Sequence, residues 1–388
     1  MSLDTCSGGP AMTKRIVLMA AMVLLGVLGG LAVPQATGML EGEFYAISMT
    51  ALLAVGLYGS THGIKIRHLR SDVGTVVLAV TVGVLLKAAL ITAVLLAVFR
   101  NPAYLVLGIA VAQIDPLSVA ALDESSWLSE RGKALLRAWA SFDDPVTTLL
   151  TIYVAALAMR FQSGAAAVHQ TLGDPAMFTI DLAGNLGVAA LAIGLYRLTG
   201  RFAPRREFPV GCAILAVVFA VGIWQTWVLA VALVGLQIQL QIPGRPGAAE
   251  RMLERAVNVA FYLAAVLLGV VLSTGVSLGP GLVLGVTAFA AHALVSLMLT
   301  RSQDRTDKVL LALAQQNGIT AIILALVLEP FFSGTVAVVA PAILVINLLY
   351  LLSNAVFTNR ARRRTRATRP GACSARSTES GRKDEVGP

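Results

Sequence analysis

The sequence predicts an all-α protein that crosses a membrane about twelve times. Hydrophobic residues make up 57% of its 388 residues, and charged residues make up only 13%. A soluble domain carries about 25% charged residues. The apolar residues also gather in runs of about 20, the length that a helix needs to cross a bilayer. This composition indicates an integral membrane protein, and a net charge of +9 therefore does not indicate nucleic-acid binding.

Twelve apolar segments follow one another along the chain. They span residues 16–34, 44–60, 73–99, 103–122, 133–159, 178–198, 208–223, 225–242, 254–274, 279–299, 308–328 and 334–357. Residues 208–242 are too long for one span, so we divide them at the polar residue Gln225. The expected domains are a cytoplasmic N-terminus (1–15), a transmembrane domain (16–358) and a basic cytoplasmic tail (359–388). The tail has too little apolar content to pack, which predicts disorder.

The positions of the basic residues support this count of spans. With the N-terminus inside the cell, 27 of the 30 lysines and arginines fall on the cytoplasmic side. Only Arg100 and Arg160 fall outside, and Lys87 lies within a span. Cytoplasmic loops of membrane proteins carry an excess of Lys and Arg, so this bias favours a cell-membrane protein with both termini in the cytoplasm.

The order of the spans predicts two inverted repeats. Spans 1–5 and spans 8–12 form two five-helix units, and spans 6 and 7 link them. An odd-length unit that recurs after an even linker has the opposite orientation in the membrane. Inverted repeats of this kind are typical of secondary transporters.

Two adjacent acids, Asp143 and Asp144, lie in the middle of the fifth span. A charge at this depth costs roughly 2.5–17 kcal/mol, so it predicts a functional site. Neighbouring helical residues point about 100° apart, so the two acids cannot serve one face equally. Pro145 frees the carbonyl of Ser141, which adds a possible cation ligand.

Two other spans carry polar interruptions at corresponding positions of the two repeats. Span 4 contains Gln113 and Asp115 beside Pro116, which frees the carbonyl of Ala112. Span 11, its symmetry mate, contains Gln315-Gln316-Asn317-Gly318. Paired interrupted helices are the best sequence indication of a transporter's substrate site.

Two further ionisable residues lie within membrane spans that are also symmetry mates. Lys87 in span 3 can pair with a buried acid or extend toward the membrane surface. His292 in span 10 can carry protons or hold a helix break through a neutral hydrogen bond. We expect a structural role for both residues.

These motifs resemble those of the monovalent cation:proton antiporter superfamily, of the sodium/proton exchanger type. Residues 54–59 and 66–70 resemble the second span and the basic loop of that family. Ile114-Asp115-Pro116 falls on its Thr-Asp-Pro motif, and Asp143-Asp144 falls on its pair of acids. Residues 316–320 resemble the second broken helix. Members with two acids usually carry a lysine in the ninth span, and this chain has none between Val257 and Thr274.

The resemblance implies a homodimeric antiporter, rather than an enzyme, that exchanges H⁺ for Na⁺, Li⁺ or K⁺ and needs no cofactor. Its cation and proton ligand would be Asp144, with Asp143 and Asp115 beside it. Burial disfavours a charged carboxylate and a bound cation favours it, so Asp144 would hold either protons or a cation. One helix bundle would move against the other around this site.

Two alternatives stay open at the level of the sequence. An intramembrane aspartyl protease also needs two membrane acids on different helices, and Asp115 and Asp144 could supply them. That group has Gly-x-Gly-Asp at its second acid, whereas this chain has residues 140–143 as Ala-Ser-Phe-Asp. A potassium-efflux member of the same superfamily is the second alternative.

Overall fold

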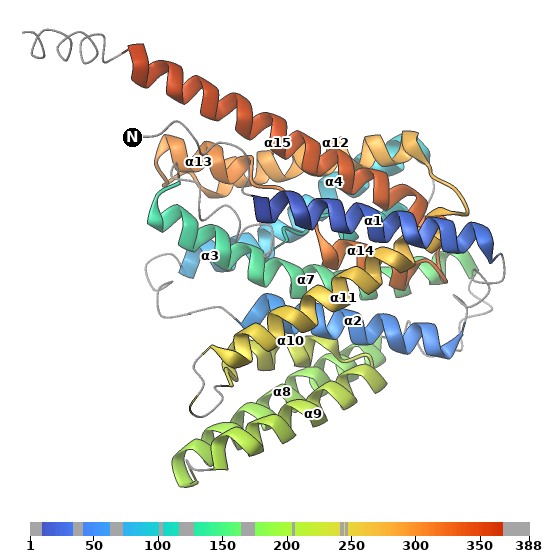
Figure 1. The fold of residues 1–388 in the computed structure, drawn as a ribbon, viewed down its shortest axis with the longest axis vertical. Helices are drawn as coiled ribbons and strands as arrows, with labels where there is room; N and C mark the ends of the chain where they lie inside the picture. The colour runs from blue at the N-terminus through green and yellow to red at the C-terminus, as the bar shows by residue number, and fades with distance from the viewer. Residues whose placement is uncertain are drawn as a thin grey trace, which may run out of the picture.

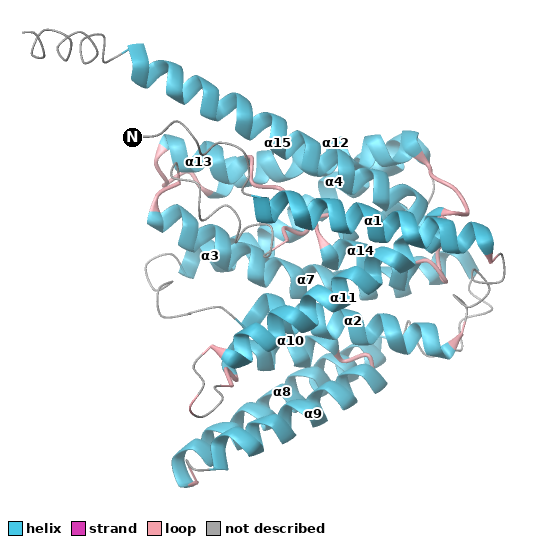
Figure 2. Ribbon diagram, viewed as in Figure 1, coloured by secondary structure: helices cyan, strands magenta, loops and turns pink. Residues whose placement is uncertain are grey.

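The computed structural model describes residues 10–33, 42–62, 73–100, 104–115, 128–163, 175–203, 206–240, 244 and 247–367. Helices joined by loops make up the whole of this described part, as Figure 2 shows. The all-α prediction is therefore confirmed. The helices are α1 (Pro10–Ala32), α2 (Glu43–His62), α3 (Val73–Leu78), η4 (Ala79–Gly83), α4 (Val84–Phe99), α5 (Tyr104–Ala110), α7 (Glu130–Ser163), α8 (Pro175–Phe202), α9 (Glu207–Trp224), α10 (Val228–Gln237), α11 (Ala248–Leu272), α12 (Leu278–Leu299), α13 (Arg305–Ala312), α14 (Ile319–Leu328) and α15 (Thr335–Ala367).

Helix is present in each of the twelve expected segments, although the helices differ in length. Within the described residues, seven helices are long and apolar enough to cross a membrane. These findings confirm a multi-pass membrane protein. The expected division at Gln225 is also confirmed, because α9 ends at Trp224 and α10 begins at Val228.

The helices at the two ends of the chain extend past the first and last expected spans. Helix α1 begins at Pro10, before the expected first span, and α15 continues to Ala367, past Asn359. The first part of the expected tail is therefore helical rather than disordered. The rest of the tail, the basic loop at 66–70 and Pro116 lie outside the described residues.

The third span contains a π-helical turn that the sequence pattern does not predict. Helices α3, η4 and α4 follow one another without a break, and η4 forms the π-helical turn. A π turn adds a residue to the helix and rotates everything after it, and such turns often occur at functional sites. Lys87 follows one turn later on α4 and therefore depends on η4 for the direction in which it points.

The helices pack as two bundles. The first bundle contains α1, α2 and α8–α11, in which α1 packs on α11 and α2 packs on α10. The second bundle contains α3, η4, α4, α5, α7 and α12–α15, in which α12 packs on α4, α13 and α15. Figure 1 shows α8 and α9 at the lower end of the molecule and α12, α13 and α15 at the upper end. The bundles meet where α2 contacts α7 and α14 and where α11 contacts α14.

Close approach of two backbones holds α1 against α11. An added Cβ on Gly26 would collide with the carbonyl oxygen of Val266, and one on Gly269 would collide with the carbonyl oxygen of Val23. Small residues allow membrane helices to approach closely, and van der Waals packing then drives their association.

Candidate functional site

Two unwound segments of the second bundle are bonded to each other. The first follows the end of α5 at Ala110 and reaches Asp115, the last described residue before the gap at 116–127. The second covers residues 313–318, between α13 and α14. The amide of Asp115 donates to the carbonyl oxygen of Gln316 at 2.9 Å, so the two segments are bonded directly to each other. A helix thus ends at both places where the sequence predicts an interruption.

Side chains of the second segment satisfy carbonyls of the first. Gln315 Nε2 donates to the carbonyl oxygen of Gln113 at 2.9 Å, and Asn317 Nδ2 donates to that of Val111 at 2.9 Å. Backbone that leaves a helix inside a membrane needs such partners, because no water is present to replace them. The sequence predicts a freed carbonyl at Ala112, whereas these side chains bind the carbonyls on either side of it.

Asn347 on α15 fixes the position of Asn317. Its Oδ1 accepts from the Asn317 amide at 3.2 Å, and its Nδ2 donates to the Asn317 carbonyl oxygen at 3.0 Å. One side chain therefore satisfies both backbone groups of a residue that lies outside any helix.

Asp144 is completely buried on α7 and accepts hydrogen bonds from three different elements. Its Oδ2 accepts from Ser60 Oγ on α2 at 3.1 Å and from Thr320 Oγ1 on α14 at 2.8 Å. When the amide of Gln113 is oriented to satisfy both of its neighbours, its nitrogen donates to Asp144 Oδ1 at 3.1 Å and its oxygen accepts from Ala321 N at 2.6 Å. Each of these donors to Asp144 is uncharged.

Asp115 lies beside Asp144 at the meeting point of the two segments. Its carboxylate packs directly on Gly318, where an added Cβ would collide with it. It is 5% exposed and lies within electrostatic range of Asp144. Two acids from separate segments therefore border one small region, and Gly318 provides the space for one of them.

Asp143 has a different set of partners from its neighbour Asp144. Its Oδ2 accepts from Lys87 Nζ on α4 at 2.7 Å and from the amide of Ile114 at 2.9 Å. Both side chains of this ion pair are buried, with exposed fractions of 1% and 0%. Lys87 therefore does not extend to the membrane surface. The family resemblance leads us to expect a lysine in the ninth span, whereas the lysine that pairs with Asp143 here comes from the third span.

The rings of Trp139 and His292 lie near Lys87. Lys87 Nζ lies 5.7 Å from the centre of the Trp139 ring, and this ring lies 5.4 Å from that of His292. His292 Nε2 lies 3.0 Å from the carbonyl oxygen of Leu311, near the end of α13. The histidine therefore contacts the last helical turn before the second unwound segment.

Of the residues expected at the site, Ser141 has the weakest connection to it. It is 6% exposed on α7, and the structure gives its hydroxyl no hydrogen bond to the described side chains of Asp143 or Asp144. The remaining expected residues form two neighbouring groups: Asp144, Asp115, Gln113 and Asn317 in one, and Asp143, Lys87 and His292 in the other.

Two functional candidates, Ser60 and Thr320, are absent from the sequence-based set. Their hydroxyls supply two of the donors to Asp144. The sequence does contain an indication for Thr320, because this residue follows the Asn317-Gly318 break by two residues. Ser60 is less conspicuous, because a serine in a membrane helix commonly bonds its own backbone. Its Oγ also lies 2.9 Å from the carbonyl oxygen of Gly56.

Comparison with known proteins identifies the fold. No protein-family model and no curated protein sequence matches this chain. A structure of the sodium proton antiporter MjNhaP1 from Methanocaldococcus jannaschii at pH 8 matches 89% of this chain and 97% of its own, with a TM-score of 0.61 and 15% identity. A second structure of the same antiporter, from an electron-microscopy map, matches 93% and 97%, with a TM-score of 0.57 and 17% identity. The resemblance drawn from the motifs is therefore confirmed at the level of the fold.

Proposed function

We propose that this protein is a secondary active antiporter that exchanges protons for a monovalent cation, Na⁺, Li⁺ or K⁺, at Asp144. The observation that carries this proposal is a fully buried carboxylate whose described hydrogen-bond donors are all uncharged. An ionised carboxylate that is buried without a positively charged partner has a high free energy. Asp144 is therefore expected to bind either a proton or a cation. Since either one neutralises the same charge, each displaces the other. The fold that the chain shares with a sodium proton antiporter supports this reading.

The surroundings of Asp144 supply oxygen atoms that suit a small cation. The carboxylates of Asp144 and Asp115 and the hydroxyls of Ser60 and Thr320 come from four segments of the chain. In transporters, unwound backbone and its neighbours commonly coordinate the coupling ion. A bound cation would therefore draw α2, α7, α14 and the first unwound segment together.

The ion pair of Asp143 and Lys87 has a supporting part in this proposal. It neutralises one of the two adjacent acids within the protein and holds the Ile114 amide, which precedes Asp115. Asp144 is then the acid left for exchange. We therefore assign the transported charge to Asp144 and the alignment of the first unwound segment to Asp143.

The packing of the helices supports inverted repeats and alternating access. If spans 1–5 correspond to spans 8–12, the contact of α1 with α11 corresponds to that of α10 with α2, and both contacts occur. Ser60 belongs to the first bundle, whereas Asp144 and Thr320 belong to the second. A movement of one bundle against the other would therefore break the bond between Ser60 and Asp144, which opens a path to the site from one side.

We assign the protein to the cell membrane as a homodimer with both termini in the cytoplasm. The orientation is supported by the 27 basic residues on one side of the expected topology.

The fold argues for exchange over intramembrane proteolysis. The geometry does so too, because Asp144 is enclosed by Ser60, Thr320 and Gln113, whereas a protease has to admit a peptide between its two acids.

The test is exchange by the purified protein in proteoliposomes that carry a pH gradient. Addition of Na⁺, Li⁺ or K⁺ in turn should collapse the gradient in the wild type. Asp144→Asn removes the charge but still accepts hydrogen bonds from Ser60 and Thr320, so it should fold and lose exchange. Glu254→Gln, which changes an exposed acid on α11, is the matched control and should behave as the wild type. Cation-driven proton flux that persists in Asp144→Asn contradicts the proposal.

A further inference from the structure

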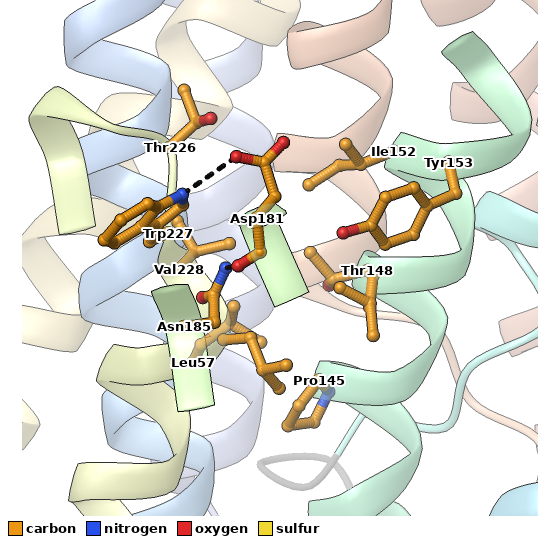
Figure 3. Close-up of a pocket in the computed structure, with 12 residues that line it drawn as sticks. Leu57, Pro145, Thr148, Ile152, Tyr153, Asp181, Asn185, Thr226, Trp227 and Val228 are labelled. Atoms are coloured by element: carbon orange, nitrogen blue, oxygen red, sulfur yellow. Dashed lines mark hydrogen bonds between the residues drawn. The ribbon is translucent and has the colours of Figure 1, made fainter. Parts of the chain in front are cut away.

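A cleft lined partly by polar side chains lies between the two bundles, next to the proposed exchange site. Its cavity volume is about 40 Å³. Its walls come from α2, α7, α8, α10 and the turn between α9 and α10, as Figure 3 shows. The polar side chains on these walls are Thr148, Tyr153, Asp181, Asn185 and Thr226.

Asp181 is the acid in this cleft. Figure 3 shows it in the middle of the lining residues, between Trp227 on one side and Tyr153 on the other. Its Oδ1 accepts from Trp227 Nε1 at 3.2 Å. The Trp227 ring is fixed in turn, because it packs so closely on Gly184 that an added Cβ there would collide with the ring. A carboxylate on a membrane helix needs a reason to be there, and one neutral hydrogen bond does not balance its charge.

Thr148 connects this cleft to Asp144. The hydroxyl of Thr148 is buried and has no hydrogen-bond partner among the described residues, although its side chain lines the cleft. Thr148 follows Asp144 by one helical turn on α7, so the two lie on the same stripe of the helix. Across the cleft, Leu57 precedes Ser60, which bonds Asp144, by about one turn of α2. The inner end of the cleft is therefore one helical turn from the proposed exchange site.

We propose that Asp181 and Thr148 form an entry site for monovalent cations, separate from the exchange site at Asp144. This inference rests on the proposed function, because it assigns a role in the same transport cycle. Asp181 attracts the hydrated cation into the cleft, and the free hydroxyl of Thr148 replaces one of its waters on the way to Asp144. The proposed orientation puts this end of α7 and the turn between α9 and α10 on the outer face of the membrane.

The indole of Trp227 allows cation binding at Asp181 to be measured without transport. Na⁺, Li⁺ and K⁺ are added in turn to purified protein, with choline chloride as the control for ionic strength. The cation should change the tryptophan emission in the wild type, in Asp181→Glu and in Asp144→Asn. The change should be lost in Asp181→Asn, which keeps an acceptor for Trp227, and in Trp227→Phe. A change that persists in Asp181→Asn, or that disappears in Asp144→Asn, overturns the inference.

Transport measures the effect of the same residues on cation capture. Asp181→Asn should raise the apparent KM for the cation about tenfold at low ionic strength, and salt should reduce the difference because it screens the charge. The maximal rate should stay within twofold. Glu43→Gln, an exposed acid at the start of α2 outside the cleft, is the matched control and should leave KM unchanged. Equal KM values for the two variants overturn the inference.

Replacement of Thr148 separates a role in transport from one in folding. Thr148→Val keeps the shape and removes an unpaired buried hydroxyl, so it should leave the thermal stability equal or higher while it lowers the flux at subsaturating cation. Thr151→Val is the control, since that hydroxyl bonds the Thr147 carbonyl oxygen within α7 and does not line the cleft. Unchanged flux in Thr148→Val contradicts the assignment of Thr148.

These experiments distinguish the entry site from the proposed function. If the wild type exchanges no cation, the proposed function fails. If the wild type is active and the variants are unaffected, only the entry site is refuted.

Discussion

At the scale of single residues, the ion pair of Lys87 and Asp143 is the feature that most constrains the site. Both groups are fully buried, and one carboxylate oxygen accepts from both Lys87 and the Ile114 amide. Removal of one partner from a buried pair leaves the other charge uncompensated. Each of the two charged groups is therefore required to neutralise the other.

This dependence gives a prediction on stability. Lys87→Met should lower the free energy of unfolding by about 3–5 kcal/mol, and the double variant Lys87→Met/Asp143→Asn should recover most of that loss. Lys133→Met is the control: its pair with Glu130 is at the surface, where an ion pair contributes about 0–1 kcal/mol. Thermal and chemical unfolding in detergent measure the stability of all three variants. A double variant as unstable as Lys87→Met would show that the charge of Asp143 is not what the lysine balances.

The sequence allowed some of these residues to be predicted and concealed others for physical reasons. Asp143, Asp144 and Asp115 stand out because charge is rare at membrane depth. Ser60 does not stand out, because a membrane serine can satisfy its hydroxyl within its own helix, as Ser60 also does with Gly56. The partner of Lys87 depends on the direction in which α4 points after the π turn of η4, and no local sequence pattern specifies that turn.

At the scale of elements, the two unwound segments position the acids. Each lacks the regular bonds of a helix, so each depends on the other segment and on side chains such as Gln315, Asn317 and Asn347. Their positions were predictable, because a proline or a polar run interrupts an apolar span. Their mutual bonds were not predictable, since they join residues about 200 positions apart.

The contact between Gly318 and Asp115 gives a prediction at this scale. In Gly318→Ala the added Cβ occupies the position of the Asp115 carboxylate, so this acid and its backbone bond to Gln316 have to move. A displacement of about 1 Å can lower the rate of a process that depends on exact positioning about 100-fold, and we expect exchange to fall at least about tenfold. Gly187→Ala is the control, because nothing lies within 4 Å of the added Cβ on α8. Unchanged exchange in Gly318→Ala proteoliposomes would show that the position of Asp115 is not critical.

At the scale of the whole molecule, the proposed exchange site lies between two bundles that contribute different groups to it. The first bundle provides Ser60, and the second provides Asp144, Thr320, Gln113 and Asp115. That the chain crosses a membrane several times could be inferred from hydropathy. The division into two bundles could not, because it depends on contacts between helices that are distant in sequence, such as those of α1 with α11 and of α12 with α4.

Competition between a proton and a cation for Asp144 is the central claim, and proton release on cation binding tests it most directly. Purified protein in detergent is kept in weak buffer with a pH indicator, and Na⁺, Li⁺ or K⁺ is added, with choline as the control. Each bound cation should release about one proton at a pH at which the free carboxylate is mostly protonated. The release should decrease as the pH rises, because the unoccupied site then holds fewer protons. It should be lost in Asp144→Asn and kept in Glu254→Gln. Release that persists in Asp144→Asn, or a wild type that binds the cation without releasing protons, would contradict the claim.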